Sequence, residues 1–151
     1  MMNAFIITML AGIIATAGMS ILLWAITRTG IADAAMIRAI GSIFTKSYAE
    51  SFGPGLTVHF IVGIIIAFFY VALISLFEPT SLAGAIALGG MVGVFHGVAF
   101  GFILVIAVAE HHPLEQFREA GFEVAIAHFL GHVVYGILIG LVVGLSGVRL
   151  F

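Results

Sequence analysis

Residues 54–77 read PGLTVHFIVGIIIAFFYVALISLF, a stretch of 24 residues without Asp, Glu, Lys or Arg. About 20 apolar residues in an α-helix are enough to cross the hydrocarbon core of a bilayer. Three further stretches, residues 1–27, 79–109 and 124–148, are equally free of charge. A charged side chain at the centre of a membrane helix costs about 2.5–3.5 kcal/mol, so a bilayer explains this sorting. The sequence therefore predicts an all-α fold, a bundle of four transmembrane helices.

The predicted spans take up most of the chain. They cover about residues 3–27, 55–77, 82–109 and 124–147 of a single membrane domain, residues 1–151. Little length is left for a soluble catalytic domain, and no catalytic motif is present, so we expect no enzyme activity. The absence of cysteine excludes disulfides, iron–sulfur clusters and thiolate metal sites. A net charge of −2 argues against a nucleic-acid partner.

The basic residues predict an orientation. Arg28, Arg38 and Lys46 lie in the first connection and Arg118 in the third, whereas Arg149 is the single basic side chain on the opposite side. Because basic loops stay in the cytoplasm, both longer connections are predicted inside. The protein is then predicted to lie in the cell (inner) membrane, with its N- and C-termini outside the cytoplasm. The first span lacks a basic leader, so we expect it to be retained as a span.

The connections carry their own patterns. Apolar residues recur at spacings of three and four between residues 31 and 51, which predicts an amphipathic interfacial helix. The Gly53-Pro54-Gly55 sequence is expected to end this helix and turn the chain into the second span. Residues 113–121 predict one or two helical turns. The short turn at residues 78–81 predicts that the second and third spans are antiparallel neighbours.

Small residues recur at every fourth position inside the spans, as in a glycine zipper. Lipid provides no hydrophobic drive for helix association, and small residues let helix backbones approach closely. We expect these glycines to form the helix-packing faces of the bundle. They are Gly63 in the second span, Gly89, Gly93, Gly97 and Gly101 in the third, and Gly136, Gly140 and Gly144 in the fourth.

The second and fourth spans also resemble one another. His59-x3-Gly63 and His132-x3-Gly136 align over nine positions without a gap. This alignment is consistent with two helix pairs related as a parallel repeat. It is equally consistent with the shared composition of apolar, glycine-rich helices.

The first span contains Gly12, Thr16, Met19 and Ser20 in the pattern Gly-x3-Thr-x2-Met-Ser. Together with the two His-x3-Gly helix starts, this pattern resembles a bacterial family of uncharacterised small four-helix integral membrane proteins (a domain of unknown function). The resemblance implies a four-helix membrane fold. It assigns no activity, so no residue role follows from it, and His96 and His128 lie outside the pattern.

Histidine supplies the main chemical signal of this chain. Four of the six histidines, His59, His96, His128 and His132, fall inside predicted spans. Ionisable side chains inside a membrane are rare and mark functional sites by default. His128 and His132 continue the small-residue spacing of the fourth span, and His59 stands in the same relation to Gly63. The remaining pair, His111 and His112, is expected in a solvated loop.

Three interpretations of the four histidines remain open. In the first, neutral imidazoles form hydrogen bonds across helices, worth about 1 kcal/mol each. In the second, His59 and His132 ligate a b-type haem, or His96 does so with His128 or His132. The haem propionates would then meet basic residues at the cytoplasmic rim, namely Arg38, Lys46 or Arg118. In the third, His128 and His132 bind copper or zinc, with His59 or His96 completing the site.

These patterns are compatible with two alternative functions. The first prediction is a non-enzymatic accessory or structural subunit of a larger membrane complex, whose partners are the lipid bilayer and other membrane protein subunits. The alternative is a membrane protein that binds b-type haem, copper or zinc through histidine, in electron transfer or metal handling.

Overall fold

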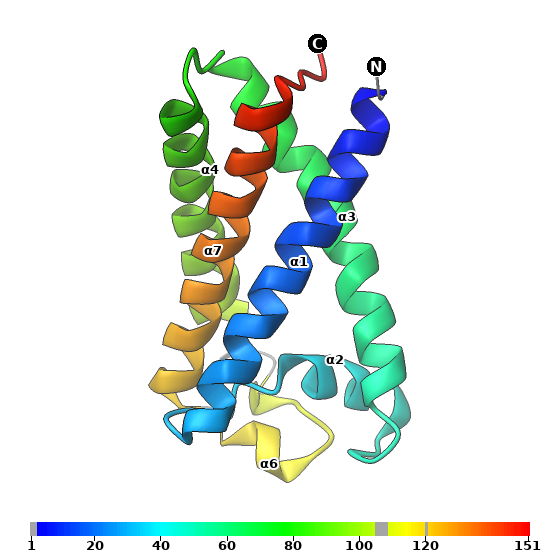
Figure 1. The fold of residues 1–151 in the computed structure, drawn as a ribbon. Coiled ribbons are helices and arrows are strands. Elements are labelled where there is room, and N and C mark those ends of the chain that lie inside the picture. Colours follow the sequence, from blue (N-terminus) through cyan, green and yellow to red (C-terminus); the bar gives the residue numbers. More distant parts are fainter. Residues whose placement is uncertain (1–2, 105–108, 120) are drawn as a thin grey trace.

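The computed structural model describes residues 3–104, 109–119 and 121–151, and these parts are helical without any strand (Figure 1). The predicted all-α bundle of four long helices is confirmed, and all four are long and apolar enough to cross a membrane. The long helices are α1 (Ala4–Thr29), α3 (Phe52–Leu76), α4 (Leu82–His96) with its π-helical continuation η1 (Gly97–Leu104), and α7 (Phe122–Ser146). The short helices are α2 (Met36–Thr45) and α6 (Glu115–Arg118).

The long helices run up and down, so that both chain ends lie at one end of the bundle and α2 and α6 lie at the other (Figure 1). Helix α7 packs along α4 and η1 on one side and along α1 on another. Helix α1 in turn packs against α3. The order α3–α1–α7–α4 makes α1 and α7 the central helices, and these two bury a larger share of their residues than α3 and α4 do.

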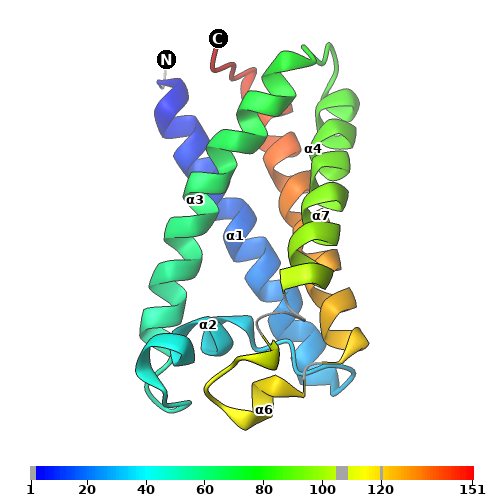
Figure 2. The same cartoon turned by 180° about the vertical axis from the view of Figure 1, so that it is seen from behind.

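Helices α3 and α4 are not the close neighbours that their short connection predicts. They contact one another little, although they are consecutive in the chain. Seen from behind, they start together at the short turn and separate toward the other end of the bundle (Figure 2). The physical reason is that α4 packs its glycine face on α7 instead, where backbone contact is closest. The bundle is therefore open between α3 and α4.

Glycine lets the α4 and α7 backbones touch. A Cβ atom at Gly89 would collide with the carbonyl oxygen of Gly136, and a Cβ atom at Gly136 would collide with that of Gly89. Gly140 meets the backbone of Ala85 in the same way, and Gly93 meets that of His132. Such close approach maximises van der Waals contact between helices. The same device joins α1 to α3, where Gly12 faces Ile64 and Gly63 faces Thr16.

Helix ends follow local sequence. The side chain of Asn3 accepts a hydrogen bond from the Phe5 amide (3.0 Å) at the start of α1, and Ser81 does the same for Gly84 (3.1 Å) at the start of α4. Gly30 and Gly147 end α1 and α7 with φ of 75° and 66°, a left-handed conformation that glycine adopts without strain.

Helix α2 is shorter than the helix expected over residues 31–51. It ends where Lys46 takes a left-handed conformation with φ of 53°. Its buried residues are the small Gly41 and Ser42, because α2 crosses α3 at Gly41 and Gly55 with backbones in contact. The apolar side chain of Phe44 on α2 is exposed. The Gly53-Pro54-Gly55 sequence does not separate the helices but lies inside the first turn of α3, where proline is tolerated.

The third span and the connection that follows it were predicted over residues 82–109 and 113–121. The regular α-helix of the span expected over residues 82–109 ends at His96 and continues as η1 to Leu104, and residues 105–108 lie outside the described parts. The one or two helical turns expected between Pro113 and Gly121 are present as α6, a single turn.

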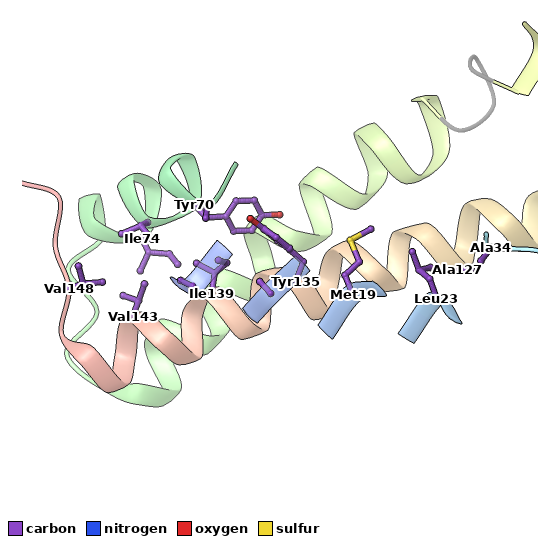
Figure 3. Close-up of a cluster of buried hydrophobic side chains, with 14 of the residues drawn as sticks. Met19, Leu23, Ala34, Tyr70, Ile74, Ala127, Tyr135, Ile139, Val143 and Val148 are labelled. Carbon is purple, nitrogen blue, oxygen red and sulfur yellow. The ribbon is translucent and has the colours of Figure 1, made fainter. Parts of the chain in front are cut away.

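The buried core runs along α1 and α7 and receives side chains from α3 (Figure 3). Ile74, Ile139 and Val143 are fully buried toward the end that carries the chain termini. At mid-height the rings of Tyr70 and Tyr135 meet edge to face, with centroids 5.2 Å apart. Tyr135 also lines a cavity that begins at this level, beyond the apolar core.

Candidate functional site

A cavity of about 420 Å³ lies inside the half of the bundle that carries α2 and α6. Its wall is built from all four long helices together with α2 and the segment that holds α6. Five of the six histidines line it, and we call it the histidine cavity. They are His59 on α3, His96 at the end of α4, His112 in the loop before α6, and His128 and His132 on α7.

His96 is fixed by a neighbouring helix. Its Nδ1 atom lies 2.8 Å from the hydroxyl oxygen of Tyr70, within hydrogen-bond distance. His96 is also the last residue of α4 before η1 begins. π-Helical segments are rare and occur frequently at functional sites, because the extra residue per turn redirects the side chains that follow. The change of helix type therefore coincides with the histidine that enters the cavity from α4.

His128 and His132 are each held by their own helix. The Nδ1 atom of His128 donates to the carbonyl oxygen of Val124 (2.8 Å), and that of His132 donates to the carbonyl oxygen of His128 (2.7 Å). A carbonyl oxygen only accepts hydrogen bonds, so both Nδ1 atoms carry the proton. In the neutral imidazole, Nε2 then holds the free lone pair. This is the arrangement in which histidine ligands are oriented in metal sites.

His96 and His132 bring two of these rings together from different helices. Their ring centroids are 4.4 Å apart with an interplanar angle of 65°. Two imidazoles bound to one tetrahedral ion have ring centres about 5 Å apart, given metal–nitrogen bonds of about 2.0 Å. The observed spacing is close to that value. It leaves no room for a porphyrin plane between these two rings.

His59 lines the same cavity and has an unsatisfied ring nitrogen. Among the described residues, the buried side-chain nitrogen and oxygen atoms that lack a hydrogen-bond partner are Nε2 of His59 and Oγ1 of Thr16. Both residues line the histidine cavity. A buried polar atom without a partner costs about 1–3 kcal/mol, so such atoms call for an explanation. A ligand inside the cavity would supply one.

The rim of the cavity is acidic. Asp33, Glu119 and Glu123 are lining residues, and the described lining contains no Lys or Arg. Haem propionates were expected to meet Arg38, Lys46 or Arg118 at this rim. Arg38 instead lines a separate groove, and Lys46 and Arg118 are exposed away from the lining. Carboxylates at the entrance attract cations and repel an anionic group.

His112 is not the solvated loop residue that the sequence indicates. It is buried, its Nε2 atom donates to the carbonyl oxygen of Ala39 on α2 (3.0 Å), and its Nδ1 atom accepts from the amide of Leu114 (3.1 Å). With both nitrogens engaged, His112 anchors the α6 segment to α2. Its partner in sequence, His111, is exposed and does not line the cavity.

The predicted histidines thus share one cavity, but they do not form a finished metal centre. In the described parts of the chain, no group of three or more His, Asp or Glu residues converges closely enough to hold a metal ion. The predicted trio is divided between α3, which carries His59, and α7, which carries His128 and His132, whereas the rings of His96 and His132 are in contact. The sequence did not predict that Thr16 or the acidic residues line the cavity, because they reach it only through tertiary packing.

Comparisons with known proteins return no match: no family model, no curated protein and no solved structure is similar to this chain. The resemblance to a bacterial family of uncharacterised four-helix membrane proteins therefore stays a prediction. Any functional conclusion rests on the cavity itself.

Proposed function

We propose that this protein is a multi-pass protein of the cell membrane that binds a transition-metal cation, zinc or copper, in the histidine cavity. The observation that carries the proposal is the pairing of His96 with His132. Their rings are 4.4 Å apart, and one nitrogen of each is engaged by a protein group. The side chain of His132 is thereby oriented as an imidazole ligand is, and that of His96 is so in the tautomer whose Nδ1 atom donates to the Tyr70 hydroxyl oxygen.

The chemistry of the wall supports a cation. Imidazole nitrogen is a preferred ligand of zinc and copper, and carboxylates at the rim would draw a cation toward the cavity. His59 is the best candidate for a third ligand, because its Nε2 atom has no partner to give up. A cation held by two or three imidazoles and completed by water would satisfy that atom, and an incompletely preformed site suits a metal that is passed on.

Metal titration of the purified protein tests the proposal. Protein extracted in mild detergent, stripped of metal and titrated with Zn²⁺ or Co²⁺, is expected to bind about one ion, with a Co²⁺ absorption spectrum typical of nitrogen ligation. His96→Ala and His132→Ala should each weaken binding at least about tenfold. His111→Ala is the matched control, since this ring lies outside the cavity wall. Equal affinity in all four proteins would contradict a site built on His96 and His132.

A b-type haem is the second candidate, favoured by the size of the cavity and by the unpartnered Nε2 of His59. The axial pair would be His59 with His132 or His128, because His96 and His132 are in ring contact. The acidic rim weighs against this alternative, since propionates would meet carboxylates. A Soret band in protein purified from haem-supplemented cells, lost in His59→Ala, would favour haem over the metal ion.

Three finer predictions accompany the proposal. Four basic side chains at the α2 and α6 end favour a cytoplasmic position for that end, with both termini outside. The antiparallel pairs α1–α3 and α4–α7 are the units that a parallel repeat would relate. The accessory-subunit prediction is compatible with metal binding, because exposed apolar faces on every span suit partner helices and lipid alike. Co-purification of a partner after mild extraction would support it.

A further inference from the structure

A second hollow lies outside the histidine cavity, between the end of α1 and the start of α2. It measures about 470 Å³ and is lined by two arginines, three aromatic residues and the first turn of α2. We call it the basic groove. Its lining residues on α1 and its continuation are Ser20, Leu23, Trp24, Thr27 and Arg28, and the others are Ala34, Ala35, Met36, Ile37, Arg38, Tyr48 and Phe52.

The two arginines carry positive charge that no carboxylate neutralises. No Asp or Glu lines the groove, and Arg28 and Arg38 form no ion pair within the described residues. The Arg38 guanidinium donates one hydrogen bond to the carbonyl oxygen of Tyr48 (2.7 Å), and its remaining N–H groups stay available. Guanidinium groups with free N–H donors bind phosphate oxygens in a forked, charge-assisted geometry.

Aromatic rings hold both guanidinium groups in place. The Arg28 guanidinium carbon lies 5.3 Å from the ring centroid of Trp24, and that of Arg38 lies 4.6 Å from Tyr48 and 5.6 Å from Phe52. Cation–π contacts of this kind orient an arginine without consuming its hydrogen-bond donors. The groove therefore presents two oriented cations.

The first turn of α2 adds to the positive electrostatic potential of the groove. Ala35 precedes the helix and forms no side-chain capping bond, and Met36, Ile37 and Arg38 of the first turn face the groove. Amide groups at a helix start point outward and carry the positive end of the helix dipole, which favours anions. Two guanidinium groups and an uncapped helix start thus converge on one hollow.

The position of the groove indicates the source of the anion. It lies at the end of α1, a candidate membrane span, where tryptophan and tyrosine gather at the level of lipid headgroups. Exposed apolar side chains, Ile21 and Trp24, continue from the groove along α1. A lipid offers both a phosphate for the arginines and acyl chains for this surface, whereas free phosphate offers only the first.

We propose that the basic groove binds the phosphate-bearing headgroup of an anionic phospholipid. This inference rests on the membrane insertion that the proposed function assumes, and it is independent of the histidine cavity. Bound lipid would secure α2 and the 30–35 segment against α1.

Lipid binding to the detergent-purified protein tests the inference by native mass spectrometry. The probes are phosphatidylglycerol and phosphatidylcholine with identical acyl chains. The wild-type protein should prefer phosphatidylglycerol about tenfold, and Arg28→Gln/Arg38→Gln should lose that preference. Lys46→Gln/Arg118→Gln is the matched control, because it removes the same charge from the same end outside the groove and should keep the preference.

Three results would overturn the proposal: an unchanged preference in the groove variant, an equal loss in the control variant, or complete displacement of lipid by millimolar inorganic phosphate. Arg28→Gln alone guards against misfolding, since Arg28 is exposed and contacts the ring of Trp24. It should reduce the preference at least threefold while circular dichroism stays unchanged. Zinc affinity of the groove variants should match that of the wild type, which separates this test from that of the metal site.

Discussion

The hydroxyl group of Tyr70 lies 2.8 Å from Nδ1 of His96, and this contact joins α3 to α4, two helices that otherwise touch little. It crosses the opening of the bundle beside the histidine cavity. The hydroxyl group fixes the orientation of a ring that lines the cavity. A tyrosine within a candidate membrane-spanning helix thus acts as a positioning residue for a candidate ligand.

Tyr70→Phe should weaken metal binding without preventing folding. The substitution keeps the aromatic ring and its edge-to-face contact with Tyr135 but removes the partner of His96. Loss of such an outer partner typically lowers metal affinity by about 10- to 100-fold. Zinc titration measures the change.

Tyr135→Phe is the matched control for this substitution. The Tyr135 hydroxyl group donates to the carbonyl oxygen of Gly63 (2.6 Å) and does not bond to a histidine. Its removal should lower stability by about 1 kcal/mol and leave zinc affinity within about twofold. Equal loss of affinity in both variants would show that general loosening, not the orientation of His96, is responsible.

Gly89→Ala should destabilise the bundle, whereas Gly90→Ala should not. A Cβ atom at Gly89 collides with the backbone of α7 at Gly136 and Gly140, and backbone atoms cannot move aside as a side chain can. At Gly90 the nearest atom, a side-chain carbon of Ile137, is at 3.4 Å, an ordinary contact. Overpacking of this kind costs about 1–3 kcal/mol. Unfolding in increasing SDS measures the difference.

His112→Ala should release the α6 segment. The substitution removes the hydrogen bonds to the Ala39 carbonyl oxygen and from the Leu114 amide, which tie this segment to α2. Trypsin cleavage after the exposed Arg118 is expected to speed up several-fold, since local opening controls such cleavage. Glu115→Ala, an exposed change in the same segment, should cleave at the wild-type rate. A similar rate in both variants would mean that His112 does not anchor the segment.

The sequence predicts the positions of the helices in the chain better than it predicts which helices pack against one another. Charge-free stretches place four long helices because a single physical rule, the cost of burying charge in lipid, acts on every residue of a span. Neighbour relations depend on which glycine faces meet, and the predicted antiparallel neighbours α3 and α4 contact one another only weakly because α4 packs on α7.

The candidate site, too, has features that the sequence predicts and features that depend on tertiary packing. His59, His96, His128 and His132 stand out in the sequence because histidine is rare in membrane helices. Their common cavity, the acidic rim and the role of Tyr70 depend on contacts between residues far apart in the chain. His112 was misjudged because its neighbours in sequence are polar, while its partner Ala39 lies 73 positions away. The basic groove likewise becomes visible only when α1 and α2 are placed together.

Single cysteines should report the proposed orientation, since the chain has none of its own. Thr80 lies in the turn between α3 and α4, at the end that carries both termini, and Ala49 lies between α2 and α3 at the opposite end; both are exposed. If the four basic side chains near α2 and α6 hold that end in the cytoplasm, a membrane-impermeant maleimide applied to intact spheroplasts should label Thr80→Cys and spare Ala49→Cys. Permeabilised membranes should label both, which controls for access. Labelling of Ala49→Cys alone in intact spheroplasts would reverse the orientation, and it would make the acidic entrance of the histidine cavity face the outside.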